Sequence, residues 1–223
     1  MDFMKWLNSL DELLYEVMSW IIFFPITLWR AIRHPLAMMA YADRQLGLPE
    51  DDQYADGLSP PLFLALSLIV AHMAGTALGE VDRIVASRHG LSALITDDTS
   101  ALLLRLLVFS LFPLLLSVQL VRKRRLPLER ETLRLPFYAQ CYPAAVFALL
   151  LNGGMILINL APDGAHLAGI AIVCFALVNY IAVQTHWFAA QLDRSLPRAL
   201  GIATAVLLQG FVLVVAAGLM FRG

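Results

Sequence analysis

Five stretches of this chain are each long enough and apolar enough to cross a membrane as a helix, and no other feature limits its fold as strongly. A spanning helix needs about 20 mainly apolar residues. The stretches that reach this length are residues 59–79, 101–121, 137–161, 165–188 and 198–221. Turn residues bound them, among them Pro60 and Pro61 at the first and Pro197 before the last. The sequence therefore predicts five transmembrane helices.

The composition argues against a soluble domain. Of the 223 residues, 60% are hydrophobic and 15% are charged, whereas a soluble domain carries roughly 45–50% apolar and about 25% charged residues. Five helices that are apolar nearly all round would leave too little polar surface to face water. We therefore expect an all-α integral membrane protein, with an N-terminal segment at residues 1–58 and a transmembrane domain at residues 59–221.

Basic residues lie mainly on one side of the predicted helices. Only Arg83, Arg88 and Arg222 lie on the opposite side. Because basic loops stay in the cytoplasm, we expect a multi-pass protein of a bacterial inner membrane, with a cytoplasmic N-terminal segment and a periplasmic C-terminus. The basic residues on the predicted cytoplasmic side are Arg30, Arg33, Arg44, Arg122, Lys123, Arg124, Arg125, Arg130, Arg134, Arg194 and Arg198.

A sixth apolar run, residues 17–29, is shorter than the other five. Its 13 uncharged residues would reach roughly 20 Å as a helix, against a hydrocarbon core of about 30 Å. Pro25 lies within it, and two arginines follow. This pattern favours an interfacial helix, or one that enters the membrane and returns. The alternative, a span that begins near Leu13, would place the first residue outside and stays open.

The predicted cytoplasmic side contains an amphipathic helix and two charged loops. Residues 35–47, "PLAMMAYADRQLG", have apolar residues at helical spacing, and we expect the acidic "EDDQYAD" at 50–56 to be a solvated loop. Residues 122–136, "RKRRLPLERETLRLP", form a basic loop, which anionic headgroups attract by about 1 kcal/mol per basic residue. The sequence thus predicts anionic-lipid contact at Arg122, Lys123, Arg124 and Arg125. A topology signal without a ligand is the alternative.

Small residues recur every four positions in the first predicted span. They are Ser67, Ala71, Gly75 and Gly79. Small side chains let two helix backbones approach closely in a membrane. We therefore expect this stripe to pack against another helix.

Seven polar residues inside the predicted spans form the candidate site, which we call the polar seam. A polar group in a membrane is costly unless it finds a partner. We favour hydrogen bonding between helices, and the alternative is a polar path for a small solute, a lipid headgroup or a proton. The five predicted spans contain no acidic residue of the kind that coupled carriers use. The members are His72, Arg105, Asn152, Asn159, Asn179, His186 and Gln209.

No pattern in the sequence indicates an enzyme. The chain has no G-x-S-x-G, H-E-x-x-H or P-loop motif. Cys141 and Cys174 lack the spacing of a disulfide framework or a zinc site. We expect no cofactor, no metal and, with a net charge of -1, no nucleic acid. The expected partners are membrane lipids, further copies of the chain and other membrane proteins.

Two short motifs resemble the Yip1-like superfamily of small integral membrane proteins. "PITLWRAIRHP" (Pro25, Trp29, Ile32, Pro35) is similar to a phrase with which bacterial members often begin, and the Tyr-Pro of "QCYPAAV" at 140–146 is similar as well. The five predicted spans, the inside N-terminal segment and the outside C-terminus are also similar to this superfamily, and this arrangement covers most of the chain. The eukaryotic relatives associate with small GTPases and with membrane shaping, whereas the bacterial ones are mostly labelled permeases.

These observations lead to two functional hypotheses. The first is a non-enzymatic scaffold or subunit of a membrane assembly, in lipid or envelope handling. The second is a permease-like transporter that moves a small solute or lipid along the polar seam.

Overall fold

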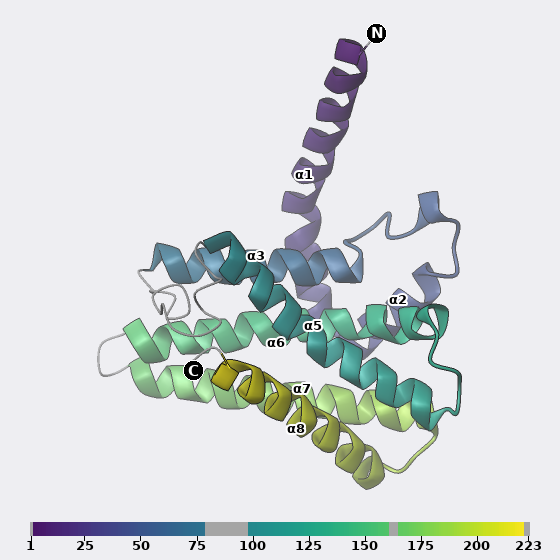
Figure 1. Cartoon of the computed structure of the whole chain (residues 1–223), viewed down its shortest axis with the longest axis vertical. Helices are drawn as coiled ribbons and strands as arrows, with labels where there is room; N and C mark the ends of the chain where they lie inside the picture. Colours follow the sequence, from purple (N-terminus) through teal and green to yellow (C-terminus); the bar gives the residue numbers. More distant parts are fainter. Residues whose placement is uncertain (1, 79–97, 161–164, 221–223) are drawn as a thin grey trace.

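The computed structural model describes residues 2–78, 98–160 and 165–220, and their regular structure is entirely helical (Figure 1). This confirms the predicted all-α class. A short 3-10 helix, η1, spans Glu50–Asp52. The α-helices are α1 (Asp2–Arg33), α2 (Pro35–Gln45), α3 (Pro60–Ala77), α5 (Asp98–Lys123), α6 (Arg130–Leu160), α7 (Ala165–Leu192) and α8 (Leu196–Met220).

Six of the described helices are long and apolar enough to cross a membrane by length and composition. Five of them, α3, α5, α6, α7 and α8, correspond to the five predicted spans. The sixth is the part of α1 from Asp11 to Arg33, 23 residues long. The helix predicted at residues 35–47 is also present, as α2.

The first helix of the N-terminal segment, α1, has 32 residues and is much longer than the uncharged run at residues 17–29. The acidic residues before that run limit membrane crossing but do not end a helix. Pro25 does not end it either. In Figure 1, α1 runs across the direction of α3, α6 and α7, and its N-terminal part stands clear of the other helices. Only 6% of its apolar window is buried, against 56% for α6.

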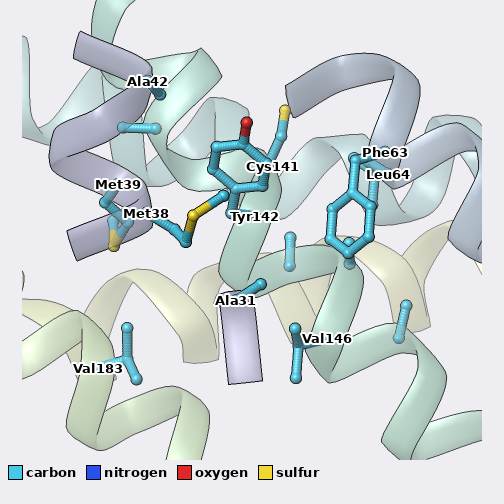
Figure 2. Close-up of a cluster of buried hydrophobic side chains, with 14 of the residues drawn as sticks. Ala31, Met38, Met39, Ala42, Phe63, Leu64, Cys141, Tyr142, Val146 and Val183 are labelled. Carbon is cyan, nitrogen blue, oxygen red and sulfur yellow. The ribbon is translucent and has the colours of Figure 1, made fainter. Parts of the chain in front are cut away.

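Helix α6 is the centre of the bundle and packs against α7, α3, α5 and α2. Every residue from 139 to 148 is buried. Figure 2 shows Tyr142 of α6 between Met38 and Met39 of α2 on one side and Phe63 of α3 on the other. The Tyr142 hydroxyl donates to the Leu58 backbone oxygen at 2.8 Å. The N-terminal segment therefore shares one core with α3 and α6.

A second core cluster joins α5, α7 and α8 to the other face of α6. The rings of Phe147 and Tyr180 stack with their centroids 4.7 Å apart. Ala199 and Ala203 of α8 and Leu116 of α5 are fully buried in the same cluster. The two clusters together place α6 between the N-terminal helices and the C-terminal pair.

Two glycines set the distance between α6 and α7. A Cβ added at Gly169 would lie 2.7 Å from the backbone oxygen of Gly154 and 2.9 Å from the backbone nitrogen of Ile158. A Cβ added at Gly154 would lie 2.7 Å from a methyl carbon of Val173. Backbone to backbone contact of this kind is how small residues stabilise helix pairs in membranes. The sequence stripe in α3 did not identify this contact.

Candidate functional site

The structure distributes the seven residues of the polar seam over five helices. Of these residues, Asn159, His186 and Gln209 are exposed on the outer surface, while Asn152 and Asn179 are half-buried. Within the described ranges, no hydrogen bond joins any of these five side chains to another. These five residues are therefore not joined to one another in the described part of the chain. They are His72 on α3, Arg105 on α5, Asn152 and Asn159 on α6, Asn179 and His186 on α7, and Gln209 on α8.

The described residues of the small-residue stripe lie in the interior. Ser67, Ala71 and Gly75 are buried on α3, and α3 packs chiefly against α6; Gly79 lies outside the described residues. His72 is 8% exposed, and its Nδ1 has no hydrogen-bond partner among the described atoms.

A buried glutamine pair, which the sequence analysis missed, connects α6 to α7. Gln184 Nε2 donates to Gln140 Oε1 at 2.6 Å, and both residues are 0% exposed. The remaining amide atoms of the pair, the Tyr180 hydroxyl and the Trp187 Nε1 have no hydrogen-bond partner in the described part of the chain. Gln140 and Gln184 each lie 22 residues from position 162, which falls between α6 and α7. That symmetry, which follows from an antiparallel helix pair, is the sequence signal that could have identified them.

The acidic segment before α3 is not a free loop, because Asp56 anchors it to the N-terminal helices. Arg30 Nη1 donates to Asp56 Oδ2 at 2.9 Å, and the Tyr41 hydroxyl donates to Asp56 Oδ1 at 2.5 Å. The Tyr41 hydrogen bond, followed by Arg30, holds the pKa of Asp56 below its usual value against the opposing effect of burial. The Leu58 backbone N–H donates to Thr27 Oγ1 at 3.1 Å. These contacts fix the segment against α1 and α2.

Asp43 on α2 has a different environment. Burial raises its pKa to about 6, although the nearby Arg124 and Arg44 oppose the shift. Asp43 is therefore a carboxyl whose charged form the folded protein disfavours.

The predicted basic loop is shorter than expected, because α5 continues to Lys123 and α6 begins at Arg130. Arg125, two residues after the end of α5, has a φ of 58°. Its N–H bonds to the Arg122 oxygen at 3.0 Å, and the Leu126 N–H bonds to the Val121 oxygen at 3.1 Å. This is a Schellman cap. The prediction of a longer loop was wrong because basic residues also form the end of α5 and the start of α6.

We call the end of the bundle where α5 and α7 finish and α6 and α8 begin the basic end. Arg124 connects two of these helices, since it donates to the backbone oxygen of Gln191 at 3.3 Å and also to the Gln191 side chain. All four residues from 122 to 125 are exposed. Lys123 also lines a cavity, whereas Arg122 and Arg125 line none of the cavities described below. The four predicted lipid contacts thus have three different environments.

Three cavities lie at the basic end. One of about 700 Å³ between α5 and α6 is lined by Arg130, Glu131, Arg134 and apolar side chains. A smaller one of about 310 Å³ between the same helices is lined by Arg124 and Glu131. The third, of about 580 Å³, lies between α5 and α8. A fourth cavity, between α7 and α8, is about 470 Å³, and apolar side chains and His186 line it.

Comparisons with known proteins find no match among family models, curated proteins or solved structures. The resemblance to the Yip1-like superfamily therefore stays a prediction. Among the described residues, no group of three or more His, Cys, Asp or Glu side chains could hold a metal ion. The class that the fold defines is a helical membrane protein. Its N-terminal helix α1 and the basic end are the features from which we propose a function.

Proposed function

We propose that this chain is a non-enzymatic scaffold or subunit of an assembly in a bacterial inner membrane, with a role in lipid or envelope handling. The basic end would face the cytoplasm, as basic loops do. The partner would be another membrane protein, held through α1. In this proposal α1 lies along the membrane rather than across it.

The observation that carries the proposal is the position of α1. We call its residues 2–22 the N-terminal arm. The arm projects from the bundle in Figure 1, and Met18, Ile21 and Ile22 are exposed on it. A helix that crosses the direction of the spanning helices lies close to the membrane plane. An apolar helix that its own chain leaves uncovered can cover an apolar surface of a second protein.

The residue pattern of the arm supports the same orientation. Polar or charged residues recur every three or four positions, at Asp2, Lys5, Ser9, Glu12 and Glu16. This spacing forms one polar stripe along a helix, and helices with one polar and one apolar face lie in the membrane interface.

The permease hypothesis has less support. A polar path requires its residues to line a common space, and none of the four cavities described above is lined by Asn152, Asn179 or Gln209. Three of the seam residues are exposed on the outer surface of the bundle.

The experiment that tests the scaffold proposal is mild extraction of the full-length protein, followed by mass spectrometry of the proteins that purify with it. We expect a partner that the wild type retains and that the variant Met18→Ala/Ile21→Ala/Ile22→Ala loses. Alanine preserves the helix and removes apolar contact area. A matched variant, Phe175→Ala/Leu177→Ala/Val178→Ala, removes exposed apolar side chains from α7 and should retain the partner.

Two results would contradict the proposal. One is equal recovery of the partner with both triple variants, because the arm would then not hold it. The other is robust solute uptake by the purified protein in liposomes, with no partner recovered from cells.

A further inference from the structure

The cavity between α5 and α8 has a basic end and, further along α8, an apolar wall, which the Gln119 side chain of α5 faces across the cavity. Lys123 is the last residue of α5. Arg194 lies in the turn before α8, and Arg198 lies in the first turn of α8. Further along α8, Ile202 and Ala205 line the same cavity. Because the spans run through the membrane, the basic side chains lie at headgroup depth and the apolar wall lies deeper.

The charge in this cavity is of one sign. None of the side chains that line it is a carboxylate, and within the described ranges Lys123, Arg194 and Arg198 form no ion pair. The two cavities between α5 and α6 differ, because Glu131 lines both of them. Basic cavities between helices at the cytoplasmic side of membrane proteins bind anionic lipid headgroups.

We propose that the cavity between α5 and α8 binds one anionic phospholipid. Lys123, Arg194 and Arg198 contact its phosphate, and an acyl chain lies along Ile202 and Ala205. A phosphate group could also come from a soluble molecule. The apolar wall is the reason to commit to a lipid, because a free phosphate would leave that wall unused. This proposal does not depend on the scaffold function.

The glycine that lines the cavity makes it possible to test shape separately from charge. A Cβ added at Gly201 meets no atom within 4 Å, so a larger side chain can enter the cavity without displacing a neighbour. Gly153 on α6 has the same open space but does not line this cavity. Gly201→Leu and Gly153→Leu are therefore a matched pair.

The test uses full-length protein in detergent, with phosphatidylglycerol or phosphatidylcholine added, and native mass spectrometry to count the lipids retained. We expect one phosphatidylglycerol molecule on the wild type and little phosphatidylcholine. The double variant Arg194→Gln/Arg198→Gln should bind phosphatidylglycerol at least about tenfold more weakly. The control Arg122→Gln/Arg125→Gln removes the same charge from the same end, outside the cavity, and should stay within about twofold of the wild type.

The shape variants and a competitor complete the test. Gly201→Leu should lower retention of phosphatidylglycerol by about tenfold, and Gly153→Leu should not. Equal losses in the two arginine variants would show general attraction to the basic end and overturn the proposal, and so would normal retention in Gly201→Leu. Displacement of the lipid by inorganic phosphate alone would assign the site to a soluble phosphate compound and overturn the lipid assignment.

Discussion

The hydrogen bond between Gln140 and Gln184 is a fully buried polar contact between α6 and α7, since both residues are 0% exposed. Each amide uses one of its two polar groups on the other, and Gln140 Nε2 and Gln184 Oε1 are left without a partner among the described atoms. An amide without a partner is costly in an apolar interior. The two residues therefore depend on each other.

We expect Gln140→Leu and Gln184→Leu each to destabilise the protein by about 1–2 kcal/mol, because each strands the other amide. The double variant should cost less than the two single changes together, by about 1 kcal/mol. The wild type, the two single variants and the double variant form a double-mutant cycle. Unfolding of each detergent-solubilised protein by sodium dodecyl sulfate, monitored by circular dichroism, measures it. Strictly additive effects would mean that the pair does not interact.

Asp43 has the opposite effect on stability from most carboxylates. Its folded pKa of about 6 lies above the usual value of 3.8. Well below pH 3.8 the group is protonated in both states, and its contribution to stability is fully present. As the pH rises through 6, the unfolded state has already released its proton, so the folded state loses stability.

Asp43→Asn should therefore leave stability nearly unchanged at about pH 3 and raise it by about 1 kcal/mol at about pH 8, an amount that allows for partial solvent screening. Thermal unfolding of wild type and variant across this pH range measures the difference. Asp56→Asn is the control of opposite sign. The pKa of Asp56 is lowered, so this change should destabilise the protein at about pH 7. The destabilisation should disappear as the pH falls below the usual pKa of an aspartate and through the lowered pKa of Asp56. A pH-independent effect of Asp43→Asn would contradict the assignment.

At the level of elements, the crossing of α6 and α7 depends on two residues without side chains. Gly154 and Gly169 bring the backbones into contact, and the glutamine pair lies further along the same interface. Because the helices are antiparallel and consecutive in the chain, residues equally far from position 162 meet. Asn152 and Asn179 are not equally far from it, which explains why they do not pair.

Gly154→Ala should destabilise the pair of helices by about 1–3 kcal/mol, because the new Cβ would overlap α7 and force the helices apart. The neighbouring change Gly153→Ala has open space around its Cβ and should stabilise α6 by roughly 0.5–1 kcal/mol, as alanine does in a helix. Denaturant unfolding in detergent separates the two. Equal stability of both variants would mean that α6 and α7 are not in close contact at Gly154.

For the whole molecule, the direction of α1 decides the topology of the N-terminus. If α3 and α5 to α8 run through the membrane, α1 lies across their direction (Figure 1). A helix in that direction does not reach the opposite side, so we expect its N-terminal end to stay on the side of the basic end. If α1 spans the membrane, Ser9 lies on the side of the C-terminus.

Cysteine labelling distinguishes these topologies. Cys174 is exposed and Cys141 is buried, so Cys174→Ser supplies a background for new single labels. We expect Ser9→Cys to react with a membrane-impermeant maleimide only where Leu128→Cys, in the turn before α6, reacts. Gly223→Cys at the C-terminus should show the opposite pattern. A Ser9→Cys pattern that follows Gly223→Cys would show that α1 crosses the membrane.

The sequence by itself determined the class of the protein and the positions of five long apolar helices. It could do so because transfer into a membrane depends on the sum of local residue contributions over about 20 positions. It also located α2, whose apolar spacing is local. It did not determine the length of α1, because charged residues interrupt the apolar run without ending the helix.

Only the tertiary structure decided which polar groups meet and which are exposed. Gln140 and Gln184 pair in the core while Asn159 and Gln209 face outward, although all four look alike in the sequence. The cavity between α5 and α8 likewise combines Lys123 with Arg194 and Arg198, which are far apart in the chain. The rotation and crossing of each helix depend on packing against several neighbours at once, and contacts of this kind are not encoded in any single stretch of sequence.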